Sequence, residues 1–401
     1  MFPSVSNNLT GLRHGARVDP IANKNRITVG WGVFFIFLFA YRCGLSVLGE
    51  LVVLTLTTLG DVDRYHRANF SIAELVQIFS IHDILHFGRL YSTLITQSVG
   101  AFIRMFAFDS LILIDIGFQA IAFVGIFKFL MAVEGTTRRY LALLMLSPSF
   151  NLWSSIASKE ALIVFFVGTL CAYLVRLYQN AFKFGWLEIL CAIGVFLFKV
   201  HYVPALLVIY LTTVVGKQVK QKAAFVFFAF LSSLVTLYLL RDKVDAMAFS
   251  IMPHFLGYGS TRGPYWIEKN DVFFKAPYGM FQAFFGPTLA ESASGPIQMV
   301  SFLESILIVG ILLIVLLRNV SRLPVFSFFA GISSLSWLLF ATYPLGIMNA
   351  GSAVRYRTGH ILLVFFIFAI MFSRDYFVRW REGTDEHHRD AKIAPQLKLG
   401  A

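Results

Sequence analysis

Two arginines near the last apolar region are the residues best suited to hold a charged substrate. Arg355 and Arg357 stand two positions apart, next to Tyr356 and close to His360. Apolar runs lie on both sides, so we expect the pair at a membrane boundary, where a guanidinium is costly unless it faces water, a counter-charge or a ligand. Its planar fork of N–H donors matches phosphate oxygens, so the pattern predicts a phosphate-binding site. The simpler alternative is that both arginines anchor the topology.

Two carboxylates follow the first apolar run. Asp61 and Asp63 lie in the segment Gly60-Asp-Val-Asp-Arg-Tyr65. A carboxylate can serve as a general base, so both are candidate catalytic residues. The alternative is that they cap the helix that follows, which is a common role for aspartate.

Other polar residues at breaks in the apolar pattern are candidates for binding substrate. We expect this role for Lys159, Glu160, Lys199, His201, Arg262, Glu304, Tyr356 and His360. The lysines have the alternative of snorkelling to the interface, and a single histidine is more often structural than catalytic. Glu304 lies inside an apolar run, where a carboxylate needs a partner or a water-filled cavity.

The composition is that of a membrane protein that crosses the bilayer several times. Of the 401 residues, 57% are hydrophobic and 14% charged, and the formal net charge is +12. In this context the basic excess indicates cytoplasmic loops and contact with anionic lipid, and we expect no nucleic-acid partner. The three cysteines fall in apolar runs without ligand spacing, so we expect no disulfide framework, no metal site and no cofactor.

The apolar runs predict an all-α polytopic membrane helical bundle. We count about ten crossings, since each needs roughly 20 apolar residues. The runs are 27–59, 110–133, 141–156, 161–177, 186–197, 203–215, 223–240, 299–317, 324–345 and 361–372. They form one transmembrane domain, 28–373, between cytoplasmic tails at 1–27 and 374–401.

Lysine and arginine are concentrated in the tails and in alternate short loops, which predicts that both termini are cytoplasmic. Two longer segments, 60–107 and 241–298, then lie on the opposite face. The first is amphipathic and suits interfacial helices, although 85–107 could also span. The second is rich in Gly, Pro and aromatic residues and predicts one large irregular loop. On this topology the candidate residues converge on one side of the membrane.

The order of these features resembles bacterial membrane proteins of glycan assembly. These are the GT-C-type glycosyltransferases, which use polyprenyl-phosphate sugars, and the Wzy-type polysaccharide polymerases. The resemblance is carried by Gly60-Asp-Val-Asp-Arg-Tyr65, Ser147-Pro-Ser-Phe-Asn-Leu-Trp-Ser-Ser-Ile-Ala-Ser-Lys-Glu160, Phe285-Gly-Pro-Thr-Leu-Ala-Glu291 with Glu304, and Gly351-Ser-Ala-Val-Arg-Tyr-Arg357. The last motif continues Thr-Gly-His360 where many relatives have proline, and the 241–298 segment lacks an arginine-rich polymerase signature.

The resemblance implies glycosyl transfer at the outer face of the bacterial inner membrane. The donor would be a polyprenyl-(di)phosphate-linked glycan, and the product a polymer of surface-polysaccharide repeat units such as O-antigen. Asp61 or Asp63 would act on the acceptor glycan, while Arg355 and Arg357 would hold the lipid phosphate, with no cofactor. Membrane lipid, a chain-length regulator or other biosynthesis proteins are the further partners implied.

Three alternatives remain from the sequence. A GT-C transferase would add a single sugar instead of polymerising. A polysaccharide transporter or flippase would explain interrupted helices and a carboxylate inside a span. A non-catalytic subunit of a biosynthetic complex would leave the paired arginines without a role.

Overall fold

The computed structural model of the chain describes residues 28–53, 61–68, 88–178, 185–214, 221–255, 261–263, 265–320 and 325–372. The predicted tails, 1–27 and 374–401, lie outside these ranges. Within them the structure contains helices and no strands; an isolated β-bridge joins Thr261 to Asn349. The expected all-helical architecture is therefore confirmed for the described residues.

Among the described residues, seven helical segments are long and apolar enough to cross a membrane. They are α1 (Val29–Leu48) with its terminal π-turn η1 (Gly49–Val53), α7 (Leu111–Ala132), α10 (Lys159–Tyr178), α13 (Lys222–Leu239), α18 (Pro296–Val320), α19 (Val325–Gly346), and α20 (Ala350–Phe366) with the π-turn η5 (Ile367–Met371). A further pair, α11 (Trp186–Phe198) and α12 (Val203–Val214), is bent by 112° at a short 3-10 turn, η2 (Val200–Tyr202), and makes up to one more crossing.

The described residues therefore supply up to eight crossings rather than the ten expected. The run 141–156 is not a span, because it divides between α8 (Gly135–Leu144) and α9 (Pro148–Trp153). Ten helical residues extend only about 15 Å, half the thickness of a bilayer core. The runs 186–197 and 203–215 are the two arms of the bent pair, so they do not count as two crossings.

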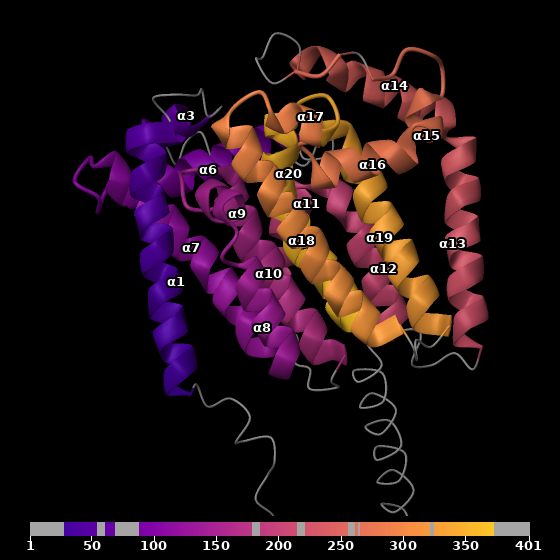
Figure 1. Cartoon of the computed structure of the whole chain (residues 1–401), viewed down its shortest axis with the longest axis horizontal. Helices are drawn as coiled ribbons and strands as arrows, with labels where there is room; N and C mark the ends of the chain where they lie inside the picture. The colour runs from indigo at the N-terminus through magenta and orange to yellow at the C-terminus, as the bar shows by residue number, and fades with distance from the viewer. Residues whose placement is uncertain are drawn as a thin grey trace, which may run out of the picture.

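The described parts of the two longer segments lie at one end of the bundle. In Figure 1, α3 (Val62–His66) and α6 (Gly88–Arg104) share this end with α14 (Arg241–Ile251), α15 (Asp271–Phe274), α16 (Ala276–Phe285) and α17 (Leu289–Ser292). We call it the α3 end. The 241–298 segment was expected to be irregular; its described part consists largely of these short helices. α1 begins at the opposite end, and α20 starts at the α3 end and runs away from it.

Helices α10 and α20 form the centre of the bundle, and α13 is the most exposed of the long helices. Leu234, Val235 and Leu239 of α13 face outward, as expected for lipid contact. Helices α7 and α10 approach closely where Gly125 meets Gly168. A Cβ at Gly168 would lie 2.6 Å from the backbone of Gly125, so only glycine allows this crossing.

The 241–298 segment is attached directly to the beginning of α20. Thr261 pairs with Asn349 in the β-bridge, and the Arg262 N–H donates to the Met348 carbonyl at 2.8 Å. A small second core of buried apolar residues supports the attachment: Ala248, Trp266, Val272, Ala276, Ala283, Tyr343, Ile347 and Met348. The N-terminus of α20 is therefore held in place from the α3 end.

Candidate functional site

Arg355 and Arg357 lie inside α20 and point in different directions. The sequence placed them at a boundary before a span that begins at 361, but the helix already starts at Ala350, with Asn349 as its N-cap accepting from the Ser352 N–H. Residues two apart on a helix are separated by about 200° around its axis and do not face each other. The expectation that both guanidiniums grip one phosphate does not agree with this geometry.

Arg355 forms a two-point ion pair with Glu160 at the start of α10. Its Nε and Nη2 donate to the two carboxylate oxygens at 2.9 and 3.2 Å. The Arg355 side chain is 21% exposed, whereas that of Glu160 is 2% exposed. Among the described residues, Arg355 forms hydrogen bonds with Glu160 alone, through Nε and Nη2. The N–H groups of Nη1 can therefore donate to another acceptor. The guanidinium also lies over the Trp153 ring, 5.4 Å from its centroid.

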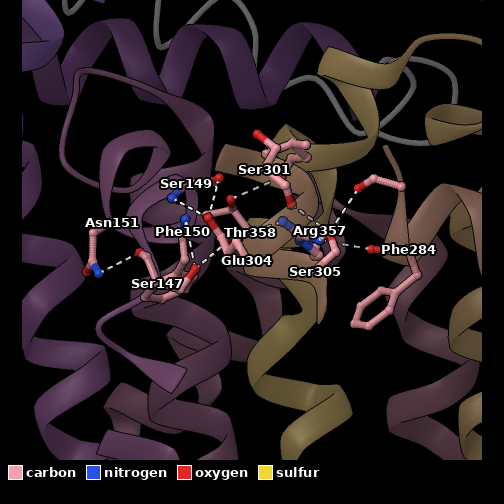
Figure 2. Close-up of polar contacts among 12 residues, drawn as sticks. Ser147, Ser149, Phe150, Asn151, Phe284, Ser301, Glu304, Ser305, Arg357 and Thr358 are labelled. Atoms are coloured by element: carbon pink, nitrogen blue, oxygen red, sulfur yellow. Dashed lines mark hydrogen bonds and ion pairs between the residues drawn. The ribbon is translucent and has the colours of Figure 1, made fainter. Parts of the chain in front are cut away.

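Arg357 is buried in a second ion pair, with Glu304 of α18 (Figure 2). The Arg357 Nη2 lies 3.1 Å from the Glu304 Oε1, and the Nη1 donates to the Ser305 hydroxyl at 2.6 Å. Ser147, the N-cap of α9, and Ser149, in its first turn, donate to the same carboxylate through their hydroxyls and through the Ser149 N–H. The network connects α9, α18 and α20, and Ser305 and Glu304 accept from the two Nη groups of Arg357.

The two aspartates also diverge. Asp61 stands at the N-cap position of α3 but makes no capping hydrogen bond. Its carboxylate instead accepts from the Tyr65 hydroxyl at 3.3 Å. Asp63 is 70% exposed and pairs with Arg67 one turn later at 2.7 Å. The structure therefore directs Asp61, and not Asp63, toward the bundle.

Charged residues from three parts of the chain lie within electrostatic range of Tyr65. Burial raises the pKa of the Tyr65 hydroxyl, and the charges of Asp61 and Glu160 raise it further while Arg355 opposes them. Tyr65 therefore stays protonated at physiological pH and remains a donor to Asp61. Asp61, Glu160 and Arg355 also lie within electrostatic range of Lys159. We call this group, Asp61, Tyr65, Lys159, Glu160 and Arg355, the Tyr65 cluster.

Lys199 and Tyr356 are adjacent to the cluster. The Lys199 ammonium lies 4.4 Å from the centroid of the Tyr356 ring, a cation–π contact, and its charge also acts on Glu160. His201 lies in η2, at the break between α11 and α12, with its ring edge-on to Tyr202 at 4.8 Å. The α11–α12 break thus delivers a second lysine beside the pair formed by Glu160 and Arg355.

The remaining two candidates have structural contacts. Arg262 is 10% exposed and forms an ion pair with Glu291 at 2.5 Å, while its Nη1 donates to the Gly346 and Ile347 carbonyls. It therefore holds the 241–298 segment onto the α19–α20 junction. His360 is buried beneath the cluster, with its Nδ1 3.4 Å from the Tyr202 hydroxyl. Neither was predicted to be a structural residue.

Comparison with family models, curated proteins and solved structures gives no match. The function must therefore be argued from the site.

The Tyr65 cluster combines two carboxylates, a protonated phenol, a lysine and a partly exposed arginine at one end of a membrane bundle. Such a set can orient a hydroxyl and balance the charge of a phosphate. Sequence reasoning gave Tyr65 no role, although it ends the motif that contains Asp61. The spacing of four residues between Asp61 and Tyr65 was the available signal, because residues i and i+4 share one face of a helix.

Proposed function

We propose that the protein transfers a glycosyl group from a polyprenyl-(di)phosphate-linked donor to a glycan acceptor at the α3 end of the bundle. The α3 end faces the outside of a bacterial inner membrane, and both termini are cytoplasmic. The product is a polymer of surface-polysaccharide repeat units. The observation that supports the proposal best is that Asp61, Glu160 and Arg355 all lie within electrostatic range of the Tyr65 hydroxyl.

The proposed roles follow from charge and exposure. Among the described residues, the Arg355 Nη1 has no hydrogen-bond acceptor, and Arg355 is the more exposed partner of its ion pair. Arg355 would therefore bind the lipid phosphate. Lys159 and Lys199 add positive charge beside it. Negative charge develops on the phosphate as the glycosidic bond breaks, and fixed cations that stabilise this charge lower the barrier.

Asp61 would receive or orient the proton of the acceptor hydroxyl. Tyr65 donates to Asp61 and holds the carboxylate on the inner side of α3. Attack on the anomeric carbon passes through an oxocarbenium-like state, as in glycoside hydrolysis, so an acid on one side and cations on the other suit the reaction. Glu160 would orient Arg355, and Arg357 with Glu304 would fix α20.

A transporter is the second candidate, because the α11–α12 pair is bent by 112° at a charged break. Interrupted helices line the substrate sites of many transporters. The two functions differ in their product: a transporter moves the lipid-linked glycan unchanged, whereas a transferase releases free polyprenyl (di)phosphate. A transferase that adds one sugar differs from a polymerase in the length of the glycan ladder.

Glycan ladders from cells test the proposal. In a strain lacking the chromosomal copy, Asp61→Asn and Arg355→Ala should abolish the ladder. Asp63→Asn and Arg67→Ala are matched controls, since this exposed pair lies on the same short helix; both should leave the ladder normal. Immunoblots of the membrane fraction establish that each variant is inserted. Normal ladders from inserted Asp61→Asn and Arg355→Ala proteins would overturn the proposal.

A further inference from the structure

Three ionisable side chains gather at the end of α3. Glu50 lies in η1 at the end of α1, His66 is the last residue of α3, and Asp115 is in the second turn of α7. Each offers one possible ligand atom, and these atoms lie within 4.8 Å of one another. The proposed glycosyl transfer gives these residues no task.

Glu50 and Asp115 together can carry two negative charges, and the one basic group that pairs with them among the described residues is His66. Asp115 is wholly buried, Glu50 is 15% exposed, and in the described part of the chain the ion pairs of both are with His66. One oxygen of each carboxylate, Asp115 Oδ2 and Glu50 Oε2, is buried there without a hydrogen-bond partner. With both carboxylates ionised, even a protonated His66 leaves a net charge of minus one. Uncompensated buried charge costs several kcal/mol, and a bound cation would remove that cost.

We propose that Glu50, His66 and Asp115 bind a divalent transition-metal ion. The His66 Nδ1 and the Glu50 Oε2 are 4.0 Å apart, close enough for one ion with bonds of about 2.0–2.2 Å to contact both. The other ring nitrogen, Nε2, lies 2.7 Å from the Asp115 Oδ1. Asp115 would exchange this hydrogen bond for a bond from its unpartnered Oδ2 to the ion and so become the third ligand.

The ligand types select the class of metal. One imidazole and two carboxylates suit Mn²⁺, Fe²⁺ or Zn²⁺, whereas Ca²⁺ and Mg²⁺ prefer oxygen ligands alone. Three protein ligands leave at least one position open for water. The spacing of the three residues along the chain does not resemble a metal motif, which is why the sequence predicted no metal site.

An ion in this place joins η1, α3 and α7, and α3 carries two members of the Tyr65 cluster. It would fix the end of α3 to both α1 and α7, and α3 holds Asp61 and Tyr65. Asp115 already accepts from the Ala157 N–H at 2.7 Å, two residues before Lys159. The site therefore has a positioning role, and it stands whether or not the protein transfers sugars.

Metal binding to the purified full-length protein tests the proposal. After treatment with a chelator, the protein in detergent is titrated with Mn²⁺ and followed by electron paramagnetic resonance. We expect one Mn²⁺ per chain, displaced by Zn²⁺. His66→Ala and Asp115→Asn should weaken binding by at least about 10-fold. Asp109→Asn is the matched control, an exposed aspartate just before the same helix, and should bind as the wild type does.

A second measurement uses the wild-type protein alone, so it tests the proposal even if the variants fail to fold. The Tm of the chelated wild-type protein should rise on addition of Mn²⁺ or Zn²⁺ and stay constant with Mg²⁺, because an ion that binds only the folded state stabilises it. Substoichiometric Mn²⁺ binding, an unchanged Tm, or wild-type affinity in His66→Ala and Asp115→Asn would each overturn the proposal. In that case His66 would simply bridge the two carboxylates.

Discussion

At the scale of single residues, the two arginines of α20 differ in what surrounds them. A spacing of two puts side chains on the same face of an extended chain but on different faces of a helix. Because α20 begins at Ala350, Arg355 reaches the partly open Tyr65 cluster while Arg357 enters the bundle. A buried ion pair such as Arg357 with Glu304 costs much of its attraction in desolvation, so its main effect appears when one partner is removed.

Substitutions in the buried pair test this assignment. Arg357→Met should lower the free energy of unfolding by about 3–5 kcal/mol, because Glu304 keeps its charge without its cation. The double variant Arg357→Met, Glu304→Met should recover part of that loss. Denaturant unfolding in detergent gives the coupling energy from the double-mutant cycle.

Arg104→Met is the control for that cycle. The Arg104 side chain is 34% exposed and pairs with an Asp109 that is 75% exposed, so the expected loss is about 0–1 kcal/mol. Equal losses for Arg357→Met and Arg104→Met would contradict the assignment of a buried structural pair.

At the scale of elements, close packing of α7 against α10 sets the position of the Tyr65 cluster. The glycines at the crossing let the two backbones touch, and α10 begins with Lys159 and Glu160. Without a hydrophobic force between helices in lipid, such packing contributes much of the association energy.

Gly168→Ala should separate α7 from α10. The new methyl would meet the Gly125 backbone at 2.6 Å, and overpacking of this kind costs about 1–3 kcal/mol. The Tm in detergent should therefore fall. Gly310→Ala in α18 is the matched control, since no atom lies within 4 Å of its added Cβ. A Tm that is equal in both variants would show that the glycine contact is unimportant.

The short helix α15 depends on one carboxylate at the α3 end. Asp271 accepts from the Lys275 ammonium and from the N–H groups of Glu268 and Ile267, which lowers its pKa from 3.8 to about 2. A lowered folded-state pKa means that the stabilisation is complete above pH 4 and is lost as the pH falls through 2.

Pepsin digestion measures the loss of the stabilisation that Asp271 gives to α15. Cleavage within 265–275 should be slow at pH 4 and faster below pH 2 in the wild type. Asp271→Asn should already be cleaved at pH 4, and Glu268→Gln, which keeps the N–H donor, should behave as the wild type does. Equal cleavage of wild type and Asp271→Asn at pH 4 would contradict the role given to this carboxylate.

At the scale of the whole molecule, the helical bundle and its asymmetry could be predicted from sequence. Most apolar runs form long helices, and the described parts of the two longer segments lie at one end of the bundle. The run 141–156 failed as a span because hydropathy does not reveal the turn at Ser147-Pro148. Nor could hydropathy show that Arg357 pairs with Glu304, or that Glu50, His66 and Asp115 meet. Those contacts depend on helix rotation, which an apolar run does not specify.

Orientation in the membrane stays a prediction from the charge pattern, with both termini in the cytoplasm. Alkaline phosphatase fused after residue 268 should be active, and a fusion after residue 372 inactive, since the enzyme folds only outside the cytoplasm. Fluorescent-protein fusions at the same positions should give the reverse pattern. Activity of the phosphatase fusion at 372 would invert the topology and place the Tyr65 cluster on the cytoplasmic face.

The most direct test of the central claim is a cryo-electron microscopy map of the protein with a bound polyprenyl-diphosphate-linked glycan. We predict density for a phosphate within hydrogen-bonding distance of the Arg355 Nη1, with the first sugar on the side of Asp61. Density for the phosphate at the opposite end of the bundle, or a headgroup that contacts neither Arg355 nor Asp61, would contradict the account.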